Sequence, residues 1–203
     1  MEDKLIEGGS KDNEGTDWEA RYREKNSSWD HGVPAPSVSE AIKFFGKGKR
    51  ILVPGCGFGH DAIALASAGN DVEGWDIAPT ALERARILGR GKTVSFHQKN
   101  VLNGSHEGNQ FDAIFEHTFL CAIGPDHWKQ AVEQFANLLR PGGLFFAILF
   151  TNLNEDSPPP WGIGTERARE LFDPYFEVLE IREPKCSFER RVGEETLWQL
   201  RLK

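Results

Sequence analysis

The chain has 203 residues, with 24 lysines and arginines against 31 aspartates and glutamates, which gives a formal net charge of −7. This length suits one domain of ordinary size, and 39% hydrophobic residues together with 21 glycines exclude a largely disordered or fibrous chain. The acidic balance argues against nucleic acid as a partner, because phosphate binding depends on a surplus of lysine and arginine.

Residues 1–16 are polar and offer almost nothing to bury, so we expect a flexible tail followed by a single domain at 17–203. The start lacks the apolar core of a secretory signal. The longest apolar run, at 143–150, is far shorter than the ~20 residues that span a bilayer. We therefore expect a cytoplasmic protein with no membrane partner, present as a monomer or a weak homo-oligomer.

Three cysteines stand far apart in the chain, at Cys56, Cys121 and Cys186. They form no paired motif, so the sequence indicates neither a disulfide framework nor a zinc site, and we expect no metal.

The predicted elements begin with an aromatic and charged stretch at 18–32, which is ended by Pro34 and Pro36. Helices are then predicted at 38–45, 61–68, 79–88, 128–139 and 166–172, and strands at 50–53, 71–76, 93–97, 111–115, 144–150, 176–182 and 196–202. Pro141-Gly142-Gly143 is a strong stop after the fourth of these helices.

Strands and helices alternate along most of this order, which is typical of an α/β fold with a mostly parallel, doubly wound sheet. The last two strands have no long helix between them, so they should close the sheet as an antiparallel hairpin. The expected class is a Rossmann-like fold with an N-terminal lid.

A glycine turn joins the first strand to the helix at 61–68, with glycines at Gly55, Gly57 and Gly59. Such a turn lets the backbone approach a ligand closely. Asp76 ends the next strand, about 20 residues on, where a carboxylate can bind the hydroxyls of a ribose. The alternative interpretation is a purely structural tight turn that binds no ligand.

The same turn discriminates between nucleoside cofactors. The dinucleotide pattern G-x-G-x-x-G requires a third glycine where His60 stands, and Asp61 would repel a pyrophosphate. The spacing G-x-G-x-G is common in enzymes that use S-adenosylmethionine (SAM), which carries no phosphate. The sequence thus favours SAM over a nicotinamide dinucleotide.

Trp18 and Tyr22 are four residues apart, on one face of a helix, and Trp29 follows. Two interpretations stay open: aromatic residues that fasten a helix to the core, or a cover over the cofactor.

Four segments carry a family resemblance. They are Trp18-Glu19-Ala20-Arg21-Tyr22, Trp29-Asp30-His31-Gly32, the residues 52–61 and the residues 111–123. Together they resemble the thiopurine methyltransferase-like family, most closely its halide/thiol methyltransferase branch, and the resemblance extends from Trp18 to about Glu180.

The resemblance implies a SAM-dependent methyltransferase fold and a set of cofactor contacts. The residues that it assigns to SAM are Trp18, Tyr22, Trp29, Gly55, Gly57, Asp76, Asn100, Val101 and His117. Tyr22 stands where relatives often carry tryptophan, and Asn100 replaces a usual aspartate. An aromatic face attracts a sulfonium cation, which fits the aromatic members of this set.

For the methyl acceptor, the resemblance points to His117 and Trp161 as catalytic residues. His117 stands where some relatives carry tyrosine, and Trp161 replaces another aromatic residue of the family. We expect a small pocket lined by these two residues with Trp29 and Phe119. His117 would take a thiol proton or hold an anion; the alternative is a structural histidine beside Glu116.

Three functions remain open at this point. The first is methyl transfer to a small thiol, sulfide, thiocyanate or halide. The second is transfer to a larger heteroaromatic thiol or to a nitrogen or oxygen acceptor. The third, from another class, is a non-catalytic SAM-binding domain. The absence of an added substrate domain favours small acceptors.

Overall fold

The structure is a computed structural model, and it describes residues 16–104, 106, 108, 110–153 and 158–203. Of the tail expected at 1–16, only Thr16 falls within these residues. No helix in this described part is long and apolar enough to cross a membrane.

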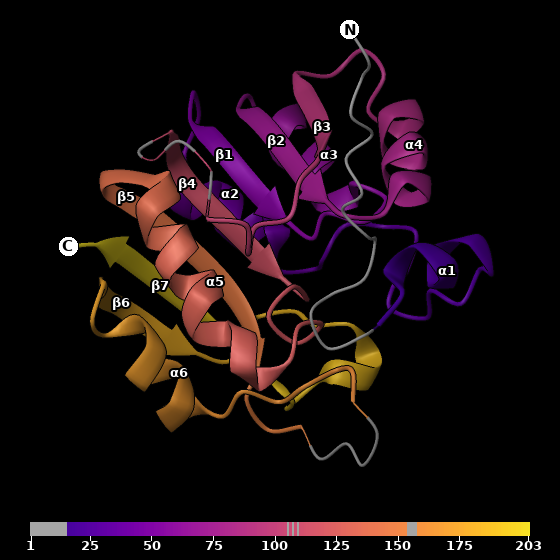
Figure 1. Cartoon of the computed structure of the whole chain (residues 1–203). Helices are drawn as coiled ribbons and strands as arrows, with labels where there is room; N and C mark the ends of the chain where they lie inside the picture. The colour runs from indigo at the N-terminus through magenta and orange to yellow at the C-terminus, as the bar shows by residue number, and fades with distance from the viewer. Residues whose placement is uncertain (1–15, 105, 107, 109, 154–157) are drawn as a thin grey trace, which may run out of the picture.

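All seven strands of the described chain lie in one sheet, in the order β3-β2-β1-β4-β5-β7-β6 (Figure 1). The strands are β1 (Arg50–Pro54), β2 (Asp71–Asp76), β3 (Val94–Gln98), β4 (Phe111–His117), β5 (Leu139–Phe150), β6 (Phe176–Arg182) and β7 (Glu195–Leu202). The first five are parallel, whereas β7 is antiparallel to both β5 and β6. The predicted doubly wound fold with an antiparallel closure is confirmed.

Helices cover both faces of the sheet. They are α1 (Trp18–Arg23), α2 (Val38–Phe45), α3 (His60–Ser67), α4 (Pro79–Leu88), α5 (Pro125–Leu138) and α6 (Thr165–Phe172), with a short 3-10 helix η1 (Glu189–Arg191). One buried cluster joins the sheet to α5 and α6, and a second joins it to α2, α3 and α4. Strand β4 supplies both clusters alternately: Ile114 faces the first, and Ala113 and Phe115 face the second. A strand buried on both faces is apolar at successive positions for this reason.

The predicted boundaries are closest where turn residues mark them and least accurate around α5. This helix begins at Pro125, where a missing backbone N–H costs nothing, rather than at 128. It ends at Leu138, and the chain enters β5 directly at Leu139. The predicted stop at 141–143 therefore lies inside β5, after the helix has already ended. It produces a shift of register instead: Phe111 pairs with Leu139, whereas Ala113 pairs with Leu144.

The parallel strands all end at one edge of the sheet, and this edge carries the predicted site. Gly55 follows β1, Asp76 ends β2 and His117 ends β4. In an open α/β sheet, ligands bind in the crevice at this edge.

Candidate active site

A cavity of about 510 Å³ lies at the carboxyl ends of β1, β2 and β4. Nine of the ten site residues predicted from the sequence line it: Trp18, Tyr22, Trp29, Gly55, Gly57, Asp76, Asn100, Val101 and His117. Residues from the N-terminal segment, the sheet edge and the β6–β7 connection thus face one space. Phe119, expected in the acceptor pocket, lines it as well.

Trp161 is the exception. It lines a separate cavity of only about 10 Å³ and packs against the apolar cluster under α5 and α6. Its backbone N–H donates to the carbonyl of Cys121 at 2.8 Å, which fixes the segment there. Pro159 and Pro160, just before it, line the large cavity in its place. The expectation that Trp161 shares one pocket with His117 does not match this arrangement.

The glycine turn needs bare backbone at two points. Gly55 and Gly57 have φ of +57° and +52°. A Cβ atom on Gly57 would lie 2.8 Å from the Tyr22 hydroxyl, and one on Gly55 would lie 2.8 Å from the Phe119 ring. A side chain at either position would be strained in its backbone and would also clash. The turn is therefore held tightly between α1 and the loop after β4.

Asp76 is buried, with 7% exposure, and both its carboxylate oxygens accept backbone hydrogen bonds. Oδ2 accepts from Gly57 N at 2.8 Å, and Oδ1 accepts from Ala78 N at 2.9 Å. Burial raises the pKa of this carboxyl group, while the backbone donors oppose the rise. Each oxygen keeps a lone pair for a further donor such as a ribose hydroxyl. Asp76 thus also ties the end of β2 to the glycine turn.

Asn100 and Val101 follow β3 and form another part of the wall. The side-chain oxygen of Asn100 accepts from Leu102 N at 2.9 Å, so the asparagine shapes its own turn. Val101 is almost fully buried, with 2% exposure.

The aromatic residues of the N-terminal segment form a cluster over the glycine turn. Trp29 meets the rings of Trp18 and Tyr22 edge-on, with centroids 5.4 and 5.5 Å away, and Tyr22 also contacts Phe58. The Trp29 indole donates to the Tyr22 hydroxyl at 3.2 Å. Burial raises the pKa of Tyr22 far above its ordinary value, so the hydroxyl stays protonated.

Helix α1 is anchored to α4 by Glu19, whose carboxylate accepts from Thr80 N at 3.0 Å and from Thr80 Oγ1 at 2.5 Å. The two interpretations of this aromatic segment therefore describe one arrangement: it is fastened to the core, and it lines the cavity.

His117 has two polar partners, and neither is Glu116. Its Nδ1 lies 3.1 Å from Oδ2 of Asp61, and its Nε2 lies 3.1 Å from Nη1 of Arg191. A guanidinium group can only donate, so Nε2 must accept and Nδ1 must carry the ring proton. Both hydrogen bonds together define a neutral imidazole with the proton on Nδ1.

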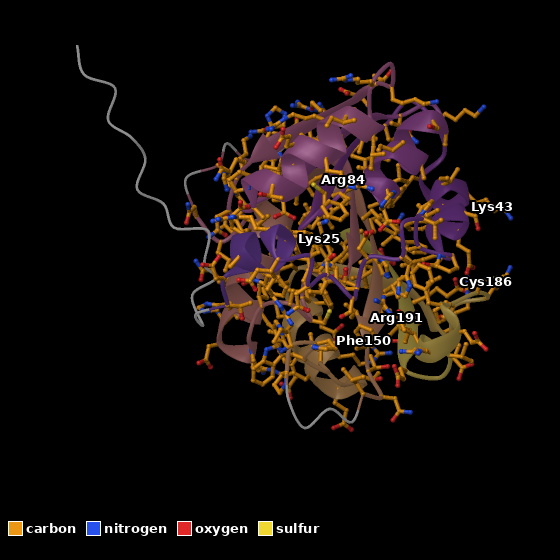
Figure 2. The ribbon with its side chains drawn as sticks, turned by 90° about the vertical axis from the view of Figure 1, so that its right-hand side faces the viewer. Lys25, Lys43, Arg84, Phe150, Cys186 and Arg191 are labelled. Carbon is orange, nitrogen blue, oxygen red and sulfur yellow. The ribbon has the colours of Figure 1, made fainter. Side chains whose placement is uncertain are left out.

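Arg191, in η1, was not identified from the sequence. Its guanidinium lies 5.2 Å from the Phe150 ring centroid and 5.4 Å from that of Phe188, and Figure 2 shows Arg191 beside Phe150. It also lies 3.5 Å from the buried carboxylate of Glu195. The pair Arg190-Arg191 was the only available signal, since no spacing rule relates it to His117, 74 residues earlier.

Phe188 connects this region to the N-terminal segment, because the His31 ring stacks on it with centroids 3.8 Å apart. Both residues line the cavity. Burial and the neighbouring Arg191 charge lower the pKa of His31. The stack therefore joins the N-terminal segment to the β6–β7 connection at the cavity wall.

Glu116 is a further buried group, with 1% exposure. Its Oε1 accepts from Phe119 N at 3.0 Å and from Leu120 N at 2.9 Å. Its Oε2 has no hydrogen-bond partner in the described part of the chain, and burial raises its pKa to about 7. Glu116 therefore fixes the turn that carries Phe119 and Cys121 to the cavity.

Known proteins agree with this architecture. The family model "Thiopurine S-methyltransferase (TPMT)" matches residues 13–200. The chain is 31% identical to the "Probable thiol methyltransferase 2" of Arabidopsis thaliana, over 89% of this chain and 82% of the relative. It is 30% identical to the "Thiocyanate methyltransferase 1" of Brassica oleracea, with the same coverage.

Solved structures with low sequence identity share the fold. One is a 1,6-didemethyltoxoflavin-N1-methyltransferase of Burkholderia thailandensis, solved with S-adenosylhomocysteine bound. It matches with a TM-score of 0.69 and 20% identity, over 91% of this chain and 84% of the other. A TehB-like SAM-dependent methyltransferase of Corynebacterium glutamicum matches with a TM-score of 0.66 and 18% identity, over 91% and 95% of the two chains.

Proposed function

The chain belongs to the thiopurine S-methyltransferase family and is a SAM-dependent methyltransferase, and from that premise we propose that its methyl acceptor is a small sulfur nucleophile: a thiol, bisulfide or thiocyanate. The observation that carries the proposal is the pair of His117 and Arg191 at the cavity wall. His117 Nε2 has a lone pair that can accept a proton, and the Arg191 guanidinium is a cation that can hold an anion.

The cofactor side of the cavity fits SAM. Asp76 offers a buried carboxylate with spare lone pairs, and the glycine turn offers backbone without side chains. The aromatic cluster supplies ring faces for a cation, and Asn100 and Val101 would meet the adenine. When bound, SAM supplies an activated methyl group and leaves as the neutral thioether S-adenosylhomocysteine.

The acceptor side suits a small anion or a thiol. Arg191 is 11% exposed and lies among aromatic rings, where a charge-assisted contact is stronger than in water. Phe119, Phe150 and Phe188 line the same cavity and give it apolar walls. Methyl transfer needs alignment and desolvation more than acid–base chemistry, which these walls provide. Trp161 is not among the residues that line this cavity.

The names of the relatives support this choice of acceptor, since two of them are called thiol and thiocyanate methyltransferases. A halide is a second candidate acceptor. It has no proton to lose, and Arg191 would hold it as an anion in the same way. A larger heteroaromatic thiol is the alternative that the test must separate.

The test is methyl production from labelled SAM with bisulfide, methanethiol, thiocyanate, iodide and an aromatic thiol as acceptors. We expect turnover with the small sulfur acceptors. Activity with the aromatic thiol alone would contradict the proposal.

Arg191→Gln sharpens the test, because the variant keeps hydrogen-bond donors but loses the charge. Losing one charge-assisted contact costs about 1.5–3 kcal/mol, so KM for thiocyanate should rise at least about tenfold. Arg201→Gln is the matched control: Arg201 pairs with Glu177 on the exposed part of β7. An unchanged KM in Arg191→Gln would remove Arg191 from the acceptor site.

We also propose that residues 17–203 act as one domain in the cytoplasm, on a small-molecule acceptor and without nucleic acid. The free thiols of Cys56, Cys121 and Cys186 are consistent with a reducing compartment. Removal of residues 1–16 should leave methyl transfer unchanged.

A further inference from the structure

Asp61 lies in the first turn of α3, directly after the glycine turn, and it joins two distant segments. Its Oδ1 accepts from the backbone N–H of Ala35 at 2.6 Å, and its Oδ2 faces Nδ1 of His117 at 3.1 Å. The side chains of Asp61 and His117 are 17% and 10% exposed, so both bonds are largely shielded from water. From the sequence, Asp61 was only an argument against a pyrophosphate at the glycine turn.

The proton on His117 is fixed by this arrangement. Arg191 can only donate to Nε2, and the carboxylate of Asp61 can only accept from Nδ1. The ring therefore presents a lone pair at Nε2, on the side that Arg191 occupies. A carboxylate that orients an imidazole in this way sets its tautomer and stabilises the imidazolium formed when the ring takes a proton.

We propose that Asp61 is a positioning residue, which holds His117 as the base that removes the proton of a thiol acceptor. This inference rests on the proposed function. The thiol replaces Arg191 as the donor to Nε2, and Arg191 then holds the developing thiolate. The S–H bond breaks and its proton moves to Nε2; the acceptor sulfur forms the bond to the methyl carbon. The electron pair of the old carbon–sulfur bond stays on the departing thioether.

Five charged or titratable groups surround His117 and set its electrostatics. Asp61 comes from α3 and Arg191 from η1. Glu116 precedes it on β4, Glu195 of β7 pairs with Arg191, and His31 of the N-terminal segment faces both His117 and Arg191. Of these, only Asp61 and Arg191 bond to the ring. Protonation of His117 would break the hydrogen bond from Arg191 and strengthen the one to Asp61. The Asp61 carboxylate would therefore stabilise the imidazolium.

Asp61→Asn distinguishes a role for Asp61 in orienting His117 from a purely structural role. The amide oxygen can still accept from Ala35 N, so the link to the N-terminal segment survives. The amide NH₂ then donates to Nδ1, which moves the ring proton to Nε2, where it meets the N–H of Arg191. The variant thus keeps the fold contact and inverts the tautomer. Asp112→Asn is the matched control, because Asp112 pairs with Arg140 at the opposite end of β4.

The experiment compares methanethiol, which must lose a proton, with thiocyanate, which has none. General-base catalysis contributes about 10²–10⁴-fold, so Asp61→Asn should lower kcat with methanethiol about a hundredfold and leave kcat with thiocyanate within about threefold. The rise of the methanethiol rate with pH should also be lost. Equal losses for both acceptors would overturn the proposal and leave Asp61 as structural support.

A readout without turnover keeps the inference separate from the proposed function. Nitrogen-15 NMR of the full chain reports the tautomer of each histidine, and His117→Phe identifies the signal of His117. We expect the Nδ1–H form in the native protein and its loss in Asp61→Asn. An Nε2–H form in the native protein would overturn the role of Asp61. Failure of methanethiol as an acceptor of the native enzyme would instead overturn the proposed function.

Discussion

The cofactor side and the acceptor side of the cavity are built in different ways. On the cofactor side, the glycine turn and Asp76 belong to two adjacent strands, and backbone hydrogen bonds connect them. On the acceptor side, His31, Asp61, His117 and Arg191 come from four separate segments, and side chains alone connect them. The cofactor side therefore depends on the geometry of the glycine backbone. The acceptor side depends on individual side chains, so the substitution of one side chain can alter which acceptor is used.

The largest effect should come from Asp76→Ala, which breaks the cofactor side. The variant loses two charge-assisted bonds from backbone N–H groups as well as the expected ribose contact. Each such bond is worth about 1.5–3 kcal/mol. Loss of the ribose contact should weaken SAM binding by about a hundredfold or more, and loss of the two backbone bonds should lower the melting temperature. Calorimetry with SAM and a thermal melt measure both.

An unchanged SAM affinity in Asp76→Ala would remove Asp76 from the cofactor site. Asp71→Ala, at the other end of the same strand, is the control: Asp71 is exposed and does not line the cavity.

His117→Phe should break the acceptor side and spare the cofactor side. We expect thiol turnover to fall about a hundredfold, since the base is lost, while iodide turnover and SAM affinity stay within a few-fold. Steady-state rates with the two acceptors measure the ratio. A loss of SAM affinity as large as the loss of thiol turnover would show that the two sides are not separable.

Glu116→Gln should give a smaller effect, on stability. The pKa of Glu116 is raised from 4.5 to about 7 by burial, so the folded state holds its proton more tightly than the unfolded state. Its contribution is complete below about pH 4.5 and is lost as the pH rises through 7, which amounts to about 3 kcal/mol at about 1.4 kcal/mol per pKa unit. The glutamine variant keeps an acceptor for Phe119 N and Leu120 N, so denaturant midpoints should lose this part of the pH dependence.

If the Glu116→Gln variant and the native protein show parallel stability curves between pH 5 and 7.5, Glu116 is not protonated there. Asp112→Asn is the control, because it changes the ion pair between Asp112 and Arg140. Its stability should depend on pH between 5 and 7.5 in the same way as that of the native protein.

The sequence was sufficient for the fold and for the family. Parallel strands buried on both faces are continuous apolar runs, and glycine and proline mark the turns between them, so the element order and the antiparallel closure were predicted correctly. The methyltransferase class was also predicted correctly, from the family resemblance of four segments. The glycine turn and Asp76 were also accessible, because adjacent parallel strands end at the same edge of the sheet. The register shift at the start of β5 was not, since it depends on pairing with β4.

Only the tertiary structure decided the acceptor side. Trp161 follows a proline run, its own backbone N–H is bonded to the carbonyl of Cys121, and its half-buried side chain packs against the apolar cluster instead of lining the large cavity. Arg191 reaches His117 from 74 residues away, and Asp61 reaches it from 56 residues away. No local pattern encodes such contacts, because they arise where loops from separate strands meet above the sheet. The tautomer of His117 follows from those contacts, so the chemistry of the acceptor site is a property of the folded chain.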